Sequence, residues 1–203
     1  MTEPVVGFDL DMTLADTRLG IAATWDAVSA RTGIWVDSSL AASRLGPPLA
    51  QEAAAWFPSE QVPAVVRLYR SLYPSIAIER SRLLPGARES FEAVRDRDGH
   101  ILVVTSKLGR LAEAHLEHLG LKPDLVVGDV FAEEKGVVLR EHAATMYVGD
   151  HLGDVRAAKV ANVLAVAVAT GPISAGELHA AGADVVLTGL TDFPDWLHRT
   201  SAV

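Results

Sequence analysis

The sequence predicts an α/β protein, in which a parallel sheet is covered by helices on both faces and a small helical domain is inserted after the first strand. Two observations lead to this prediction. Short apolar runs alternate with helical patterns after residue 84, at a spacing typical of strand–helix–strand units. Residues 16–82 are rich in Ala, Leu and aromatic residues and contain no convincing strand. We therefore expect one domain from residues 1–15 and 83–203, and a second from residues 16–82.

The expected elements follow one another closely. After a strand at residues 5–8, a helix covers residues 16–33, beginning at Asp16 or Thr17 and ending at Gly33. Further helices in the insertion are expected at about 48–57 and 60–73. The aromatic residues that should belong to the core of the insertion are Tyr69, Tyr73, Trp25, Trp35 and Trp56. The later strands are expected at 100–105, 125–127, 145–149, 163–169 and 184–187. The later helices are expected at 87–97, 110–119, 136–142, 153–161, 174–181 and 192–198.

Composition limits the possible functions. The 203 residues carry a formal net charge of −8, which argues against a broad surface for nucleic acid or anionic membranes. The absence of cysteine excludes disulfides and thiolate catalysis. Neither a signal peptide nor an apolar run of membrane-spanning length is evident, so we expect a cytoplasmic protein. Monomer and homodimer both remain open.

Two carboxylates follow the first strand. Asp9 and Asp11 alternate with Leu10, so in extended geometry they share one face. Neighbouring carboxylates repel each other unless a cation or a proton intervenes. Mg²⁺, which takes carboxylate and carbonyl oxygens as ligands, is the cation that we expect. The alternative is a strand-to-helix turn in which Asp11 or Thr13 caps a helix.

Three further polar signals fall near the ends of later strands. Thr105, Ser106 and Lys107 follow one strand and offer two hydroxyls and a cation to an anion. Asp150 and Asp154 are four residues apart after another strand, where a turn entering a helix could direct both at one point. Ligands of open α/β sheets bind at the carboxyl ends of the strands. These residues are therefore expected to meet Asp9 and Asp11.

Lys135 lies between these signals, near an expected helix start. Its acidic neighbours would make it a solvated surface charge if it were considered alone. Together with the other groups, it could bind phosphoryl oxygens alongside Thr105 and offset the charge that develops on them.

The complete set suits phosphate-ester hydrolysis, which needs a nucleophile, a cation and a proton donor. Asp9 could attack phosphorus and form an aspartyl-phosphate, while Asp11 could protonate the leaving group and later deprotonate water. Asp150, supported by Asp154, could hold Mg²⁺ beside Asp9.

These motifs resemble those of the haloacid dehalogenase superfamily, and specifically its Mg²⁺-dependent phosphatases. Residues 9–13 match the D-x-D-x-T signature, and Thr105, Lys135 and the segment Gly149-Asp150 to Asp154 match the remaining motifs in order. The resemblance implies a three-layer, doubly wound (Rossmann-like) core with a helical cap. It also implies that Asp9 is the nucleophile and Asp11 the acid/base, and that the Asp11 backbone carbonyl joins Asp9, Asp150 and Asp154 around Mg²⁺.

The insertion resembles the cap that reads the leaving group in this family. Its segment 44–49 looks like the substrate-specificity loop of the phosphoglycolate phosphatase branch, so 2-phosphoglycolate is one expected substrate among small phosphorylated metabolites. Arg44 could bind such an anionic substrate, or could be a solvated surface arginine. The other candidate substrate residues are Thr13, Gly46, Lys107 and His151.

Two other functions remain open. A phosphomutase similar to β-phosphoglucomutase would use the same Asp9 and Asp11 but return the phosphoryl group to the substrate. Outside enzymes, a phosphoacceptor or binding domain also carries acidic strand ends, a Thr and a Lys. An insertion after the first strand and about 70 residues after Lys135 argue against a signalling domain.

Some residues depart from the family pattern. Met12 stands where Gly is usual, and Asn162 stands where Gly often ends a helix, although Asn also tolerates the left-handed conformation. Gly136 replaces a frequent Pro after Lys135. His115 and His118, three residues apart, have no evident third ligand and are expected to be surface or half-buried residues.

Overall fold

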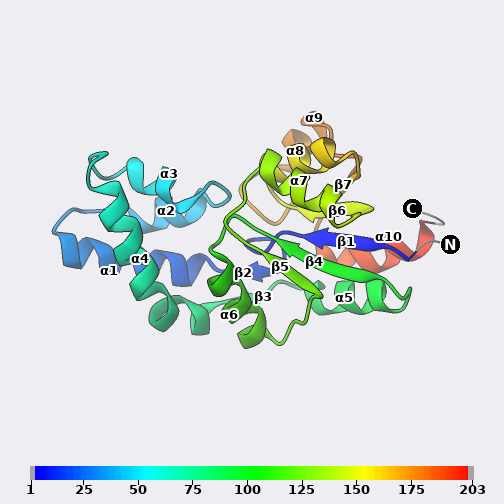
Figure 1. Ribbon diagram of the computed structural model, residues 1–203, viewed down its shortest axis with the longest axis horizontal. Helices are drawn as coiled ribbons and strands as arrows, with labels where there is room; N and C mark the ends of the chain where they lie inside the picture. The colour runs from blue at the N-terminus through cyan, green and yellow to red at the C-terminus, as the bar shows by residue number, and fades with distance from the viewer. Residues whose placement is uncertain (1–2, 201–203) are drawn as a thin grey trace.

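The computed structural model describes residues 3–200 and contains a parallel six-stranded sheet with the order β5-β4-β1-β6-β7-β8 (Figure 1). Its strands are β1 (Val5–Phe8), β4 (His100–Val104), β5 (Leu125–Val127), β6 (Met146–Gly149), β7 (Leu164–Val168) and β8 (Val185–Leu187). From β1 the chain adds β4 and β5 on one side of this strand, and then β6, β7 and β8 on its other side. The carboxyl ends of β1, β4 and β6 therefore lie side by side at one edge of the sheet. The predicted α/β fold is confirmed.

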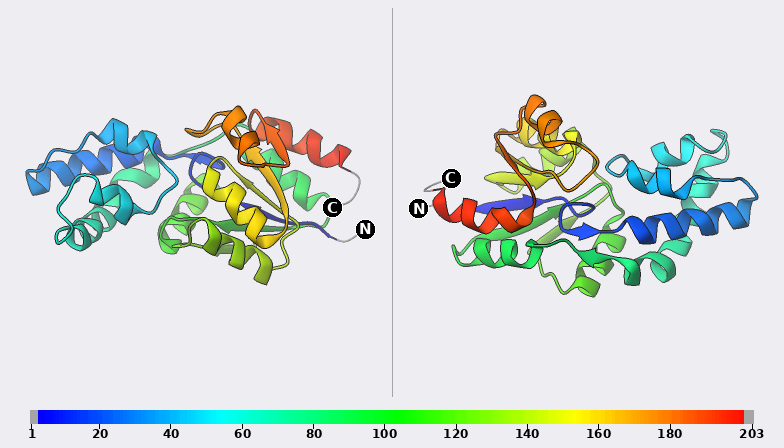
Figure 2. Two further views of the ribbon diagram at one scale, coloured as in Figure 1. Left: turned by 90° about the horizontal axis from the view of Figure 1, so that it is seen from above. Right: turned by 180° about the vertical axis from the view of Figure 1, so that it is seen from behind.

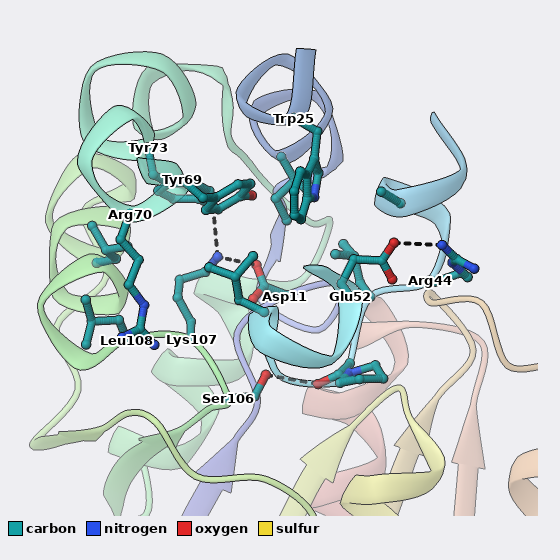
Figure 3. Close-up of a pocket in the computed structure, with 17 residues that line it drawn as sticks. Asp11, Trp25, Arg44, Glu52, Tyr69, Arg70, Tyr73, Ser106, Lys107 and Leu108 are labelled. Atoms are coloured by element: carbon teal, nitrogen blue, oxygen red, sulfur yellow. Dashed lines mark hydrogen bonds and ion pairs between the residues drawn. The ribbon is translucent and has the colours of Figure 1, made fainter. Parts of the chain in front are cut away.

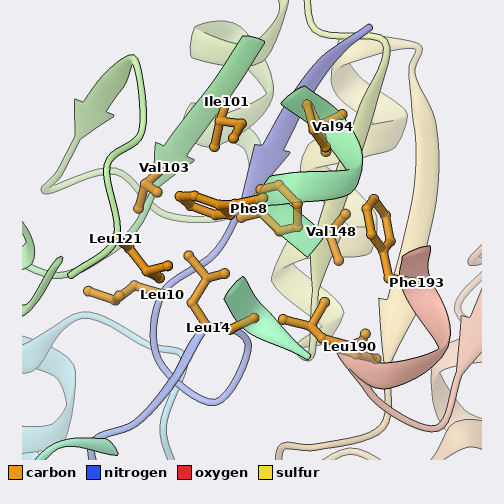
Figure 4. Packing of buried hydrophobic residues seen from close by; sticks show 14 of the residues in the cluster. Phe8, Leu10, Leu14, Val94, Ile101, Val103, Leu121, Val148, Leu190 and Phe193 are labelled. Carbon is orange, nitrogen blue, oxygen red and sulfur yellow. The ribbon is translucent and has the colours of Figure 1, made fainter. Parts of the chain in front are cut away.

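Alternation along the strands divides the core between two faces. Val6 and Phe8 of β1 belong to one apolar cluster, while Val5 packs against the other. On the first face, the centroid of the Phe8 ring lies 5.4 Å from that of Phe91 and 5.6 Å from that of Phe193. Figure 4 shows Phe8 and Phe193 among the buried residues of this face. Because successive side chains of a strand point to opposite faces, the apolar residues of these strands contribute to a core on each face of the sheet.

Helices cover both faces. One cluster includes residues of α5 (Ala87–Arg95), α6 (Gly109–Leu119) and α10 (Phe193–Arg199). The opposite face is covered by α7 (Glu133–Glu141), α8 (Leu152–Ala161) and α9 (Ala175–Ala180). Gly7 permits the close approach of α7, because a Cβ there would lie 2.6 Å from Leu139 Cδ2.

The insertion forms a separate body with its own apolar cluster, which we call the cap (Figure 2). Its helices are α1 (Arg18–Thr32), α2 (Ser38–Ser43), α3 (Leu49–Ala54) and α4 (Val62–Ala77), followed by the 3₁₀ turn η1 (Ile78–Arg80). Trp25, Tyr69 and Tyr73 are buried in this cluster, as predicted, and Trp56 packs against it. Trp35 is 72% exposed, so its predicted place in the core of the cap is wrong.

Several elements differ from expectation. The short helix α2 was not predicted, and it begins at Ser38 because Asp37 accepts a hydrogen bond from the Leu40 amide. An unpredicted ladder joins the two chain segments that enter and leave the cap, β2 (Ala15–Asp16) and β3 (Arg82–Leu83). Helix α4 continues through Pro74 to Ala77. Helix α7 begins three residues earlier than predicted, which places Lys135 in its first turn.

Two local predictions concern left-handed residues. Asn162 ends α8 with a φ of 59°, as predicted. Met12 also has a φ of 59°, so it takes a conformation that favours Gly while its side chain is buried. Among residues 3–200, no helix combines the length and apolar character needed to cross a membrane.

Candidate active site

Three buried carboxylates meet at the carboxyl end of the sheet. Asp9 follows β1, and its amide donates to Val148 O of β6, 2.9 Å away. Asp150 follows β6, and Asp154 lies in the first turn of α8. One carboxylate oxygen from each of the three lies within 4.8 Å of the others. The sheet order brings together residues that are far apart in sequence.

Lys135 is the cation of this cluster. Its Nζ lies 2.9 Å from Asp9 Oδ1 and 2.7 Å from Asp154 Oδ1. The residue is only 3% exposed, so the surface position expected from its sequence neighbours alone is wrong. Helix α7 turns Lys135 inward although Glu133 and Glu134, in the same turn, are exposed.

Electrostatics show that negative charge exceeds positive charge here. Burial, together with nearby Asp154 and Asp11, raises the pKa of Asp9 to about 6 despite the opposing effect of Lys135. Burial and the carboxylates of Asp154 and Asp9 likewise raise the pKa of Asp150 well above its ordinary range. Lys135 is desolvated, but its two carboxylate partners raise its pKa, so it stays charged.

The donor set fits a divalent metal ion. Asp9, Asp150 and Asp154 offer carboxylate oxygens, which Mg²⁺ prefers, and a single lysine leaves part of their charge unmatched. Thr13 orients Asp150 by donating from Oγ1 to Oδ1 across 2.8 Å. Asp154 accepts a hydrogen bond at Oδ2 from the His151 amide, 3.0 Å away.

Asp11 lies in a different environment. Its Oδ1 accepts a hydrogen bond from Thr17 Oγ1 at 2.5 Å and lies 3.2 Å from Lys107 Nζ. Burial acts to raise the pKa of Asp11, but Lys107 and the Thr17 hydroxyl outweigh it and lower the pKa. Asp11 therefore loses its proton more readily than Asp9, although the two residues are only two positions apart.

Thr17 is a site residue that the sequence did not reveal. We expected Asp16 or Thr17 to begin this helix, and Thr17 is the N-cap of α1, but its side chain caps no amide of that helix. Its hydroxyl is used by Asp11 instead. Thr17 lies six residues after Asp11, and the alternation of carboxylates in the D-x-D motif does not predict a contact at that separation.

The three residues after β4 have different surroundings. Thr105 is 1% exposed and accepts a long hydrogen bond from the Lys107 amide at 3.3 Å. Ser106, which we expected to bind phosphate, donates its hydroxyl to Gly46 O of the cap, 2.9 Å away. Lys107 points into a pocket and donates to Tyr73 Oη across 2.8 Å (Figure 3).

This pocket lies between the core and the cap. Core residues that line it include Asp11, Ser106, Lys107 and Leu111, and cap residues include Trp25, Arg44, Gly46, Tyr69 and Tyr73. Arg44 does not project alone as a free cation, because its guanidinium lies 2.7 Å from Glu52 Oε1 and over the ring of Trp56. The pocket therefore places Asp11 beside a mixed apolar and polar chamber.

Gly46 and His151 form a contact between the cap and the core. Gly46 has a φ of 127°, and a Cβ there would lie 2.7 Å from His151 Cδ2. His151 is the N-cap of α8, and its Nδ1 accepts from the Gly153 amide at 3.0 Å. Gly46, which lines the pocket, thus packs closely against the His151 ring, and the lack of a side chain at Gly46 permits this approach.

Comparisons with known proteins find relatives that match most of this chain. The protein named "Probable phosphatase IndB" from Dickeya dadantii is 30% identical over 91% of this chain and 89% of its own length. A phosphoglycolate phosphatase from Chromobacterium violaceum is 28% identical over 94% of both chains. A haloacid dehalogenase-like family hydrolase from Streptococcus pneumoniae shares the fold with a TM-score of 0.84, at 21% identity and with coverage of 97% and 99% of the two chains.

The family model described as haloacid dehalogenase-like hydrolase matches residues 6–159, which is more than half of the chain. The match begins in β1 and ends in α8, so it includes the three clustered carboxylates and Lys135. The chain therefore belongs to the haloacid dehalogenase-like hydrolase family.

Proposed function

We propose that this hydrolase cleaves phosphate monoesters of small metabolites through an aspartyl-phosphate on Asp9, with Mg²⁺ as its cofactor. The observation that carries the proposal is the division of the acidic groups. Asp9, Asp150 and Asp154 converge around Lys135, whereas Asp11 lies apart and faces the pocket. A nucleophile and a proton-transfer group are thereby separated, as two-step phosphoryl transfer requires.

In the first step, an oxygen of the Asp9 carboxylate attacks phosphorus and the bond to the ester oxygen breaks. Protonated Asp11 gives its proton to the departing oxygen, so the leaving group departs as an alcohol. Asp11 is ionised in the arrangement described above. The approach of an anionic phosphate ester raises its pKa and favours the protonated acid.

In the second step, water attacks the phosphorus of the aspartyl-phosphate. Asp11, now ionised, takes the proton of this water, and the bond between phosphorus and the Asp9 oxygen breaks. Inorganic phosphate leaves and Asp9 is regenerated as a carboxylate. One side chain thus serves as acid and then as base.

Asp9, Asp150, Asp154 and the Asp11 backbone carbonyl are the proposed environment of Mg²⁺. When bound, the ion supplies positive charge that neutralises phosphoryl oxygens. Lys135 keeps the Asp9 side chain in place through its 2.9 Å contact and contributes further positive charge. Buried Thr105 is the proposed hydroxyl donor to the transferred group.

For the substrate, 2-phosphoglycolate is the first ester to test, because a relative named phosphoglycolate phosphatase matches nearly the whole chain. Arg44, the expected partner of an anionic substrate, is paired with Glu52, and Arg70 of the same pocket is paired with Asp129. Lys107 faces the pocket beside Asp11. A screen of phosphorylated metabolites is therefore the necessary companion experiment.

The basic test is hydrolysis of p-nitrophenyl phosphate with Mg²⁺, with and without a chelator. Asp9→Asn is expected to abolish phosphate release, and the chelator to do so in the wild type. Asp26→Asn, at an exposed position on α1, is the matched control and should keep full activity. Full activity of Asp9→Asn, or equal rates with chelator, would refute the mechanism. Turnover that depends on an added sugar bisphosphate would instead indicate a phosphomutase.

A further inference from the structure

A chain of hydrogen bonds extends from Asp11 through the interface between cap and core. Lys107 Nζ lies 3.2 Å from Asp11 Oδ1 and donates to Tyr73 Oη at 2.8 Å. Tyr73 Oη is 3.0 Å from His115 Nε2, and His115 Nδ1 is 2.9 Å from Ser81 Oγ. Tyr73, His115 and Ser81 are each at most 1% exposed, so no water shell replaces these contacts.

The Ser81 end of the chain fixes the proton on one ring nitrogen of His115. Ser81 Oγ is 2.5 Å from Ile78 O, a carbonyl that can only accept a hydrogen bond. The single hydroxyl proton of Ser81 must lie in this short contact, because two oxygens without a proton between them would repel each other. Ser81 Oγ is then the acceptor of its contact with His115, and Nδ1 is the donor.

The Lys107 end leads to the same assignment. An ammonium group only donates, so Tyr73 Oη accepts from Lys107. Burial raises the pKa of Tyr73 well above its ordinary value, so the phenol keeps its own proton. That proton is directed at His115 Nε2. Burial and the nearby charge of Lys107 lower the pKa of His115 to about 4, so the imidazole is neutral and Nε2 can accept.

The members of this chain come from three parts of the molecule. Tyr73 belongs to α4 of the cap, His115 to α6 of the core, and Ser81 to the segment that leaves the cap just before β3. Lys107 lies in the loop between β4 and α6. The complete set of donors and acceptors therefore exists only while α4 is seated against α6.

We propose that Tyr73 and His115 are positioning residues, which hold the Lys107 ammonium beside Asp11 when the cap is seated. They touch no reacting atom and act through Lys107. The inference rests on the proposed role of Asp11 in proton transfer. Tyr73 thereby couples the position of the cap to the position of Lys107 beside Asp11, the group that protonates the leaving oxygen.

The first test is imidazole ¹⁵N NMR of the wild-type protein at pH 7. This measurement requires no catalytic activity, and variants are needed only to assign the histidine signals. His115 is expected to carry its proton on Nδ1, with Nε2 unprotonated. The exposed His118, one turn later on α6, serves as the internal reference. A proton on Nε2, or a doubly protonated ring, overturns the proposal.

The second test compares two aryl phosphates whose leaving groups differ in their need for a proton. Tyr73→Phe should lower kcat for phenyl phosphate by about ten- to a hundredfold, the effect of losing one hydrogen bond to a charged group, here the Lys107 ammonium. His115→Leu removes the neutral partner of Tyr73 and should lower the same rate by about tenfold. The loss should be smaller for p-nitrophenyl phosphate, because nitrophenolate leaves readily without an acid. A purely structural role would lower both rates equally, and that result overturns the proposal.

Two further variants complete the design. His115→Gln can still accept from Tyr73 through its side-chain carbonyl, so it should recover activity that His115→Leu loses. His118→Leu removes an exposed histidine from the same helix and should leave both rates unchanged. If the wild type hydrolyses neither ester, the proposed function fails, and the NMR assignment alone then decides whether the hydrogen-bond chain exists.

Discussion

Lys135 Nζ donates to Asp9 Oδ1 across 2.9 Å, although 126 positions separate the two residues in the chain. The same ammonium reaches Asp154 at 2.7 Å, and all three side chains are buried. Removal of one member of a buried ion pair leaves the partner charge without compensation, which is far more costly than loss of an exposed pair. The cluster should thus be stable only while positive charge is present.

Replacement of Lys135 with methionine should lower the free energy of unfolding by about 3–5 kcal/mol without added metal ions. MgCl₂ should restore part of this loss, because a divalent cation would compensate the carboxylates. Thermal melts with and without MgCl₂ measure both effects. Lys122→Met, at an exposed position, is the control and should change little. An unchanged melting temperature for Lys135→Met would contradict the described ion pairs.

Gly46→Ala should weaken catalysis by displacing the cap loop. The φ of 127° is strained for alanine, and the new Cβ would collide with the ring of His151. We expect kcat/KM to fall by about tenfold, equivalent to roughly 1.4 kcal/mol of transition-state stabilisation. Gly33→Ala separates the two causes, because Gly33 also has a positive φ but nothing within 4 Å. Equal activity losses in both variants would show that the loop contact is unimportant.

Gly7→Ala should destabilise the core by about 1–3 kcal/mol, as expected for overpacking of a filled interior. Its Cβ would press on Leu139 and Tyr147, both fully buried, and would push α7 away from the sheet. Gly176→Ala in α9 meets nothing within 4 Å and should stabilise the protein by about 0.5–1 kcal/mol. Urea denaturation of the two variants provides the measurement, and stability changes of the same sign would contradict the packing.

His115 should make stability depend on pH in a defined direction. Its pKa is lowered from 6.5 to about 4 in the folded protein, so between these values the unfolded chain binds the additional proton. Stability from this group is therefore present above pH 6.5 and is lost as the pH falls, by roughly 3 kcal/mol once the pH is below 4. His115→Gln should show a shallower fall than the wild type in urea denaturation series. His118→Gln should retain the steep fall.

Much of the fold followed from local patterns. Apolar runs such as Ile101 to Val104 are long enough for a buried strand and too short for a helix, and their alternation with helical segments predicted the parallel sheet. The same reasoning located the carboxylates, because strand ends of such a sheet share one edge. The ladder between β2 and β3 escaped prediction, since two residues in each strand carry no periodic signal.

The polar partners of buried side chains could not be predicted in the same way. Tyr73 was predicted to belong to the core of the cap, and it does, but its place in an apolar core does not show what its hydroxyl binds. Those partners are 34 and 42 positions away, on Lys107 and His115. His115 was expected at or near the surface and is fully buried, because α6 packs against the cap as well as the sheet.

The short β2–β3 ladder has a consequence for the history and engineering of this chain. Asp16 and Arg82 face each other across an antiparallel pair, so the whole cap interrupts what would otherwise be a simple hairpin. A tight turn could join the two strands in a version without the cap, although Lys107 and His115 of the core would then lose their contacts with Tyr73. The segment between Asp16 and Arg82 is therefore one structural unit, and transplanting it as a whole would test the expectation that the cap reads the leaving group.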